Sequence, residues 1–344
     1  MAQDLLASVR LALSVALAHL RVVPWGACCT YGALALLSVT FLMYLVPQLF
    51  LDLFCSRGQD LRKKYDAKWA LVTGASTGIG KSLAMRLADQ GLNVVLVALD
   101  QPVFDETFEE IQEAYPKQKF KKVATNLGAP GYMDDIRGAT QRLDVQLVFN
   151  NAGYMLTGFF FDSPLDAQAA NMECNATAAM QISHYFVGKM VARGVPGCVV
   201  FTSSAAAAMP SPFTVLYAAT KSFLSSFGAS LAAEVKSKGI DVCVIHPSPV
   251  ASRFYDKAHK LDMLDFFKGF AVDPDSLPDI ILGSVGRTVW RDIGATAVFF
   301  RLMMKVFDYN FLATLTANIA HTMADYKRHA SKPKRGRRSS AARR

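Results

Sequence analysis

Apolar residues are arranged in two different ways along the chain. Residues 30–51 carry no charged side chain, and a stretch of roughly 20 apolar residues is long enough to cross a bilayer as a helix. Residues 5–23 are also apolar but include Arg10 and Arg21, which favours an amphipathic interfacial helix or a weak second span. We therefore expect residues 1–55 to form a membrane anchor. The alternative is a hydrophobic helix packed against the chain's own domain.

From residue 68 onward, short β-branched runs alternate with longer helical stretches. Each strand-like run is continuous rather than alternating, as expected for parallel strands that are covered on both faces. These runs are residues 69–73, 94–98, 122–124, 146–150, 198–202 and 240–245. Helical patterns lie between them, notably over 165–192 and 215–238. The alternation predicts an α/β fold, a Rossmann-like doubly wound parallel sheet that binds its ligand at the carboxyl ends of the strands.

The positive charge is concentrated at one end of the chain. The formal net charge is +9, and residues 327–344 contain nine Lys and Arg and no acid. We expect a disordered basic tail over residues 326–344, because such a segment cannot bury enough apolar surface to fold. It is either a solvated terminus or a segment attracted to anionic lipid head groups. No aromatic residue interleaves with these bases, so nucleic acid is not an expected partner.

Basic residues are denser after the expected span than before it. Those that follow it are Arg57, Arg62, Lys63, Lys64 and Lys68, whereas only Arg10 and Arg21 precede it. Because the more basic flank normally stays cytosolic, we expect the folded domain to face the cytosol. The six cysteines form no CxxC pair and have no histidines at metal-ligand spacing, which predicts reduced thiols and no metal site.

A glycine-rich loop closes the first predicted strand and opens a helix. Glycines permit a tight turn and close backbone approach, and a helix N-terminus offers free amide groups to a pyrophosphate. The alternative is an ordinary glycine-rich turn. The candidate cofactor-binding residues of this loop are Gly74, Ser76, Thr77, Gly78, Ile79 and Gly80.

The motif Tyr-x-x-x-Lys is the strongest catalytic signal, although it occurs three times. The three pairs are Tyr115/Lys119, Tyr185/Lys189 and Tyr217/Lys221. Pro116 makes an ordered helix through the first pair improbable. Of the three tyrosines, Tyr217 has a serine, Ser204, thirteen residues upstream at the end of a predicted strand. This spacing matches that of the family whose resemblance is described below, and the resemblance therefore selects the third pair.

These residue types suit the reduction of a carbonyl group. A ketone that gains hydride must also receive a proton, and Tyr217 can donate it. Lys221, one helical turn further on, is expected to lower the pKa of Tyr217 toward the working pH. Ser204 can donate a hydrogen bond to the substrate oxygen. Each candidate alone could instead be structural: Tyr217 as a core tyrosine, Ser204 as a strand-end cap and Asn175 as a helical polar residue bonded to the backbone.

Together, these features resemble the short-chain dehydrogenase/reductase family. The resemblance rests on the TGxxxGxG loop, the Asn-Asn-Ala-Gly sequence at 150–153 and the serine, tyrosine and lysine, and it covers residues 68 to about 252. It implies that Lys221 also binds the nicotinamide ribose and that Asn175 holds a water in the proton relay. It further implies that the cofactor contacts Asn151, Ala152, Gly153, Pro247 and Val250.

The resemblance leaves the choice of cofactor less certain. Asp100 lies where an acid binds the ribose of NAD in a general dinucleotide fold, but the family's deciding positions fall at Ala98 and Leu99, which are neither acidic nor basic. Lys81 would favour a 2′-phosphate. We expect NADP, with NAD as the alternative. Asn126 stands where the family usually has an aspartate near the adenine.

The remaining segment suggests the class of substrate. Residues 253–325 are rich in phenylalanine and methionine, which together with an anchor favours a lipid-like substrate. The plan resembles the 17-beta-hydroxysteroid dehydrogenase and very-long-chain 3-oxoacyl-CoA reductase branch. We expect a catalytic domain over residues 66–325 that reduces a keto-lipid, or oxidises the matching alcohol, at the endoplasmic reticulum membrane. The alternative is a family member that has lost its catalytic activity and acts as a membrane-bound binding or scaffold protein. The resemblance leaves open whether the chain forms a homodimer.

Overall fold

The computed structural model describes residues 25–255 and 261–330, together with Arg10 and Ser14. The chain divides into two compact units, residues 1–49 and residues 50–344. Apart from Arg10 and Ser14, the expected interfacial segment 5–23 lies outside the described residues. Residues 331–344 of the expected basic tail also lie outside them.

Helix α2 (Trp25–Phe54) contains the expected membrane span. Its residues Gly26–Phe54 include a stretch with a mean hydropathy of 2.0, of which 6% is buried. Within the described part of the chain, α2 is the one helix that is long and apolar enough to cross a membrane.

Seven parallel strands form the sheet of the second unit, in the order β3-β2-β1-β4-β5-β6-β7. They are β1 (Trp69–Thr73), β2 (Asn93–Ala98), β3 (Phe120–Ala124), β4 (Val145–Asn150), β5 (Gly197–Thr202), β6 (Ile240–Pro247) and β7 (Trp290–Ile293). The strand order reverses between β1 and β4, so this sheet is the predicted doubly wound one. The loops at the carboxyl ends of β1 and β4 therefore face a common crevice.

The sequence pattern missed β7. This strand reads Trp-Arg-Asp-Ile, and its two central residues are charged yet buried, with 1% and 3% of their surfaces exposed. Arg291 pairs with Asp52 at 2.6 Å, and Asp292 pairs with Arg301 at 3.2 Å. A strand that buries ion pairs has no apolar run, which is why six strands were predicted rather than seven.

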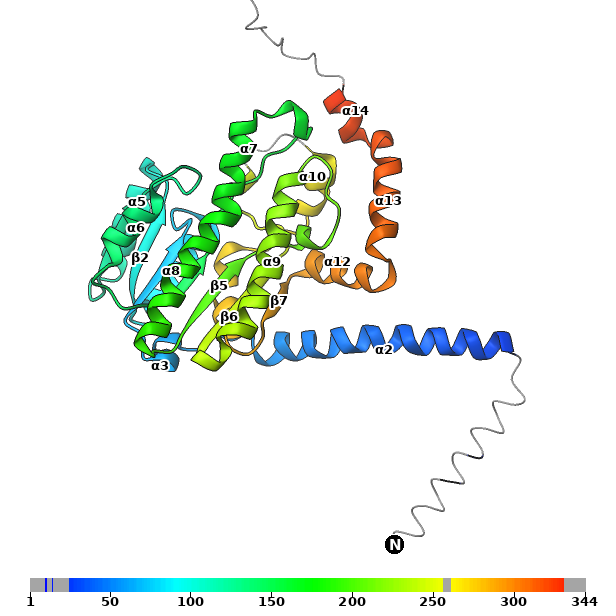
Figure 1. The fold of residues 1–344 in the computed structure, drawn as a ribbon, viewed down its shortest axis with the longest axis horizontal. Helices are drawn as coiled ribbons and strands as arrows, with labels where there is room; N and C mark the ends of the chain where they lie inside the picture. Colours follow the sequence, from blue (N-terminus) through cyan, green and yellow to red (C-terminus); the bar gives the residue numbers. More distant parts are fainter. Residues whose placement is uncertain (1–9, 11–13, 15–24, 256–260, 331–344) are drawn as a thin grey trace, which may run out of the picture. The chain divides into compact units, whose positions relative to one another are not determined.

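Helices cover both faces of the sheet (Figure 1). One face packs against α4 (Gly78–Asp89), α5 (Pro102–Ala114) and α11 (Leu277–Ser284). The other packs against α6 (Tyr132–Thr140), α8 (Ala178–Arg193) and α9 (Val215–Val235). The predicted helix 165–192 is interrupted, because α7 (Leu165–Met172) continues into α8 through a π-helical turn at Glu173–Thr177.

The other elements lie at the margins of this layered core. The remaining α-helices are α3 (Leu61–Tyr65), α10 (Asp262–Lys268), α12 (Ala295–Val306), α13 (Tyr309–Ile319) and α14 (Ala324–Ala330). Short 3-10 turns are η1 (Phe160–Asp162), η3 (Ala205–Ala208), η4 (Lys236–Lys238), η5 (Arg253–Tyr255), η6 (Pro274–Ser276) and η7 (Ala320–Thr322).

Two expected boundaries differ from the structure. Leu61 and Tyr65 of α3 are buried in the core, so the packed unit begins before residue 66. Residues 326–330 belong to α14, so assigning them to a disordered tail was wrong. Tyr326 and His329 pack their rings against Phe159 and Phe213, and these contacts hold the helix in place.

Candidate active site

A cavity of about 890 Å³ lies at the carboxyl ends of the strands. It is large enough for a drug-sized or dinucleotide-sized ligand. Fourteen of the predicted site residues line it, namely Gly74, Ser76, Thr77, Gly78, Ile79, Asn126, Asn151, Ala152, Gly153, Ser204, Tyr217, Lys221, Pro247 and Val250. Gly80, Asp100 and Asn175 are not among its lining residues. The fold therefore brings together most of the residues that the sequence singled out.

The glycine-rich loop has the geometry that a pyrophosphate requires. Gly74 has a φ of +65°, a left-handed conformation that favours glycine. A Cβ on Gly80 would lie 2.1 Å from the carbonyl oxygen of Gly74, so only glycine lets α4 pack this close to the turn. Thr77, the N-cap residue of α4, makes no side-chain cap hydrogen bond. The first amide groups of α4 therefore remain available to an anion.

Thr73 and Asn151 join the ends of three strands beneath this loop. The Thr73 hydroxyl accepts hydrogen bonds from the backbone N–H groups of Asn151 at 2.9 Å and Ala152 at 3.0 Å. The Asn151 amide donates to the Thr73 carbonyl at 3.2 Å and accepts from the Thr202 hydroxyl at 3.1 Å. Thr73 begins the TGxxxGxG motif but was not predicted as a site residue, and nothing in the sequence pointed to Thr202.

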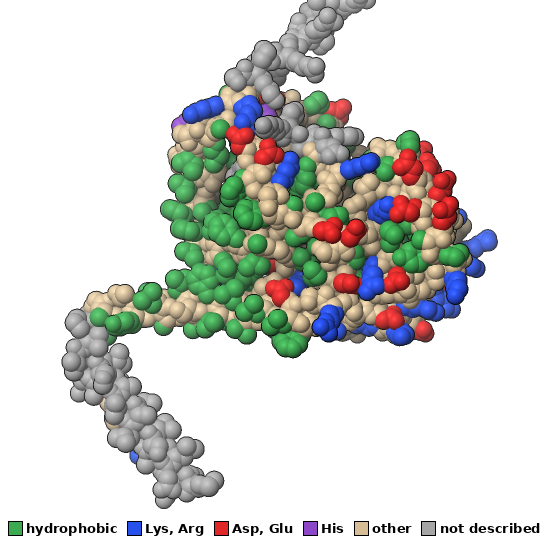
Figure 2. Space-filling model, turned by 180° about the vertical axis from the view of Figure 1, so that it is seen from behind, with side chains coloured by type: hydrophobic (Ala, Val, Ile, Leu, Met, Phe, Trp, Pro, Cys, Tyr) green, Lys and Arg blue, Asp and Glu red, His purple; other side chains and the backbone are tan. Residues whose placement is uncertain are grey.

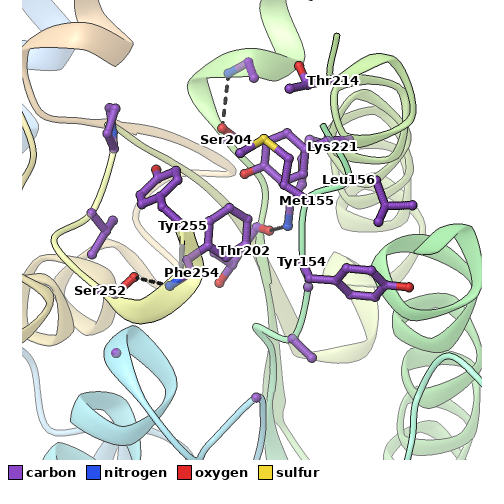
Figure 3. Close-up of a pocket in the computed structure, with 18 of the residues that line it drawn as sticks. Tyr154, Met155, Leu156, Thr202, Ser204, Thr214, Lys221, Ser252, Phe254 and Tyr255 are labelled. Atoms are coloured by element: carbon purple, nitrogen blue, oxygen red, sulfur yellow. Dashed lines mark hydrogen bonds between the residues drawn. The ribbon is translucent and has the colours of Figure 1, made fainter. Parts of the chain in front are cut away.

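Tyr217 and Lys221 lie on the first turns of α9 and face the cavity. The Lys221 ammonium nitrogen is 5.7 Å from the centre of the Tyr217 ring and donates a hydrogen bond to the Thr202 carbonyl at 2.7 Å. The Ser204 hydroxyl accepts a hydrogen bond from the Ala206 backbone N–H at 3.2 Å, and it lies near enough to Tyr217 for hydrogen bonding to lower the pKa of Tyr217. Figure 3 shows Ser204, Thr202 and Lys221 converging on the same part of the cavity. The catalytic group predicted from the spacing is thus assembled.

Burial decides the protonation states of this pair. Desolvation, with a smaller contribution from Tyr255, raises the pKa of Tyr217, and only the hydrogen bond from Ser204 opposes this rise. Desolvation also lowers the pKa of Lys221 to about 8. The pKa of Tyr217 is therefore not lowered toward neutral in this structure, and the expected effect of Lys221 stays a prediction. Lys221 is buried and Tyr217 is partly buried, which penalises the charged form of each, and the ammonium is directed at a carbonyl.

Asn175 is fully buried in the π-helical turn and supports a loop of the cavity. Its Oδ1 accepts a hydrogen bond from the Tyr154 backbone N–H at 2.9 Å. Its Nδ2 donates to the Tyr154 carbonyl at 2.8 Å and to the Thr220 hydroxyl at 3.3 Å. The side chain therefore clasps the loop that follows β4. Its role in holding a catalytic water stays a prediction.

The residues proposed to select the cofactor occupy unexpected positions. Asp100 is exposed and lies outside the cavity lining, whereas Leu99 and Gln101 contribute to it. Lys81 pairs with Glu110 at 2.6 Å. Lys81 also lies outside the cavity lining, so the structure gives no support to the argument that Lys81 favours a 2′-phosphate.

The other two Tyr-x-x-x-Lys pairs do not line the cavity. Tyr115 ends α5, and Lys189 on α8 donates to loop carbonyl groups, including that of Thr140 at 3.3 Å. The choice of Tyr217 by its distance from Ser204 thus selects the one pair that faces the cavity.

Aromatic side chains surround the cavity beyond Tyr217. The ring of Phe254 lies 5.7 Å from that of Tyr217, and Tyr255 is beside it (Figure 3). Phe267 and Phe300 line the cavity further out, with ring centres 5.0 Å apart. The aromatic content of residues 253–325 predicted an apolar substrate region but not which of its side chains would line the cavity. Phe213 also lines the cavity, and nothing in the sequence pointed to it.

Comparisons with known proteins agree with this geometry. A family model described as short chain dehydrogenase matches residues 68–261. A very-long-chain 3-oxoacyl-CoA reductase of Coprinopsis cinerea is 33% identical over 255 residues, which cover 69% of this chain and 71% of that protein. A very-long-chain 3-oxoacyl-CoA reductase-like protein of Arabidopsis thaliana is 31% identical over 242 residues, which cover 70% of this chain and 76% of that protein.

Solved structures share the fold. One, from a study of 7beta-hydroxysteroid dehydrogenase, has a TM-score of 0.66 and 23% identity, and the match covers 75% of this chain and 99% of the other. A short-chain dehydrogenase from Sphingobium yanoikuyae in complex with NADPH has a TM-score of 0.61 and 22% identity over 75% of this chain and 98% of the other.

Proposed function

The chain belongs to the short-chain dehydrogenase family of oxidoreductases, and we propose that it is a membrane-bound reductase acting on a long-chain 3-oxoacyl-CoA. Ketosteroids are the second substrate class to test. The observation behind this proposal is that Tyr217, Ser204 and Lys221 line one cavity, which becomes aromatic beyond these residues.

The cavity offers separate places for cofactor and substrate. The uncapped start of α4 would hold the pyrophosphate, and Lys221 with Gly153 would border the nicotinamide ribose. When bound, the reduced nicotinamide supplies hydride. Ser204 would donate a hydrogen bond to the substrate oxygen, and Tyr217 would deliver the proton that completes the alcohol.

Reduction is the direction that these protonation states support. Burial keeps Tyr217 protonated at neutral pH, and a neutral phenol is the acid that an alkoxide needs. Lys221 stays positively charged below a pH of about 8 and stabilises negative charge near the phenol oxygen.

NADP is the cofactor that the lining supports better. Among the described lining residues, the charged ones are Lys221, Arg253 and Asp325. The end of β2 contributes Ala98 and Leu99, neither of which is acidic. A carboxylate there would bind the ribose hydroxyls of NAD and repel a 2′-phosphate.

Membrane attachment fits both the substrate and the chain. Helix α2 is long enough to span, and the basic residues that follow it include three consecutive ones in α3 (Leu61–Tyr65). The proposed location is the endoplasmic reticulum membrane with the catalytic unit in the cytosol. The naming of the curated relatives as very-long-chain reductases supports a lipid substrate.

Oxidation of NADPH and NADH by the purified full chain tests this function. The substrate panel contains 3-oxoacyl-CoAs of increasing chain length and ketosteroids. Tyr217→Phe should lower kcat about 100-fold or more, since general acid catalysis typically contributes that much. Tyr185→Phe is the matched control, because this tyrosine belongs to the same motif but lies outside the cavity. Binding of NADPH without turnover of any substrate would instead favour a retired enzyme.

A further inference from the structure

Helices α12 and α13 present apolar side chains to solvent. On α12, Phe299 and Val306 lie seven residues apart and so share one side of the helix. On α13, Phe311, Leu315 and Ile319 recur every four residues and form a single stripe. Between 41% and 53% of the surface of each of these five side chains is exposed.

The two stripes are continuous. At the corner between the helices, Phe307 stacks on Phe311 with ring centres 5.8 Å apart. We call this surface the C-terminal apolar face, and it consists of Phe299, Val306, Phe307, Phe311, Leu315 and Ile319. Figure 2 shows hydrophobic side chains gathered on this side of the molecule with few charged ones among them.

Packing against the domain does not explain this face. Leu312 is the one buried residue of α13, so most of the helix's apolar side chains point away from the core. A soluble domain normally turns the apolar stripe of such a helix inward. A contiguous apolar surface of this kind marks a site of interaction with a protein or a membrane.

Charge identifies a lipid surface as the partner. Between residues 295 and 319 the only acid is Asp308, whose carboxylate caps α13 by accepting hydrogen bonds from the backbone N–H groups of Asn310 and Phe311. The bases in this segment are Lys305, which is exposed, and Arg301, which pairs with Asp292 on β7. Residues 327–344 add nine bases and no acid. Apolar stripes flanked by cations are typical of helices that lie in the interface of an anionic bilayer.

The inner side of α12 belongs to the cavity. Thr296 and Phe300 line it, and the ring of Phe300 lies 5.8 Å from that of exposed Phe299. One helix thus separates the candidate substrate cavity from the C-terminal apolar face.

We propose that the C-terminal apolar face lies in the interfacial layer of a bilayer that contains anionic lipid. Helix α12 is then a wall shared by membrane and cavity, along which an acyl chain passes from the lipid to the active site. This inference rests on the proposed lipid-like substrate. It adds a second membrane contact to the span in α2.

Photo-crosslinking of the full chain in vesicles of phosphatidylcholine and phosphatidylserine tests the contact. The photoreactive residue p-benzoylphenylalanine replaces Phe311 or Leu315 in two variants. The control variant carries it at Val191 on α8, which at 41% is as exposed as Leu315. We expect lipid adducts at 311 and 315 and none at 191. Adducts with a second copy or another segment of the chain, equal labelling at 191, or no adduct at all would overturn the inference.

A kinetic test separates membrane contact from a structural role. The Phe311→Glu/Leu315→Glu variant should raise KM for a long-chain 3-oxoacyl-CoA about tenfold, because the charged face leaves the lipid. Its kcat for a short-chain, water-soluble 3-oxoacyl-CoA should be unchanged, and Val191→Glu should alter neither constant. Equal losses with both substrates, or no loss with either, would contradict the proposal.

The two proposals can fail separately. Absence of keto-substrate turnover by the unaltered chain, together with lipid adducts at 311, would refute the proposed function and leave the membrane contact standing. Turnover of a keto-substrate without lipid adducts would refute the membrane contact and leave the proposed function standing.

Discussion

Replacing Asn175 by alanine tests whether this residue acts as a clasp. The variant removes the acceptor of the Tyr154 backbone N–H and one of two donors to the Tyr154 carbonyl. The carbonyl keeps its bond from Asn171 Nδ2 at 2.9 Å. The N–H group therefore loses its partner, whereas the carbonyl does not.

The magnitude follows from this asymmetry. An unsatisfied buried donor costs about 1–3 kcal/mol, and the space left by the amide of a fully buried side chain adds about 1 kcal/mol. We expect the free energy of unfolding to fall by about 2–4 kcal/mol, which corresponds to a decrease in Tm of roughly 3–7 °C for a domain of this size.

Thermal unfolding of the detergent-purified full chain measures the effect. Asn171→Ala is the matched control, because it removes a buried asparagine that bonds the same carbonyl but leaves both groups of Tyr154 paired. Its decrease in Tm should be clearly smaller. An Asn175→Ala variant with unchanged Tm and reduced kcat would refute the clasp and favour the water-holding role. An Asn171→Ala decrease as large as that of Asn175→Ala would also contradict the reasoning.

Three further outcomes follow from the structure. Because burial lowers the pKa of Lys221 to about 8, kcat/KM for reduction should fall about tenfold per pH unit above that value as the cation is lost. A flat rate profile from pH 7 to 10 would count against this loss of activity. The free energy of unfolding should rise over the same range, since the unfolded chain binds the proton of Lys221 more tightly. Gly80→Ala should abolish NADPH binding in titrations, because its Cβ meets the Gly74 carbonyl, whereas Gly138→Ala, with open space around it, should not. Tyr65→Phe should lower the free energy of unfolding by about 1.5–3 kcal/mol through its lost bond to charged Asp241, with kcat unchanged in the assay.

Most of the sheet could be predicted because most of its strands are buried on both faces. A nearly continuous apolar run is the signal of such a strand. The six predicted runs all fall within strands, including the edge strand β3, in which only Val123 is buried. β7 was not predicted, because Arg291 is buried through an ion pair with Asp52, a residue far away in the sequence. The π-helical turn at Glu173–Thr177 was also not predicted, since its residues are compatible with an ordinary helix.

At the site, the sequence predicted which residues meet but not how they interact. Motif spacing selected Tyr217 and Lys221, yet the pKa of each depends on burial, which a local pattern does not contain. Lys81 was read as available for a phosphate because its partner Glu110 lies on another helix. The contacts of Asn175 with Tyr154 likewise depend on the tertiary fold.

The spacing between Ser204 and Tyr217 has a physical basis in the structure. Thr202 at the end of β5 and the following Ser203 both bond to Lys221 on α9. The Thr202 carbonyl accepts from the Lys221 ammonium at 2.7 Å, and the Ser203 hydroxyl donates to the Lys221 carbonyl at 2.8 Å. These two bonds fix the position of α9 against β5, so that Ser204, the next residue, lies near Tyr217. The intervening segment must span this one arrangement, which is why a Tyr-x-x-x-Lys pair elsewhere in the chain cannot substitute for Tyr217 and Lys221.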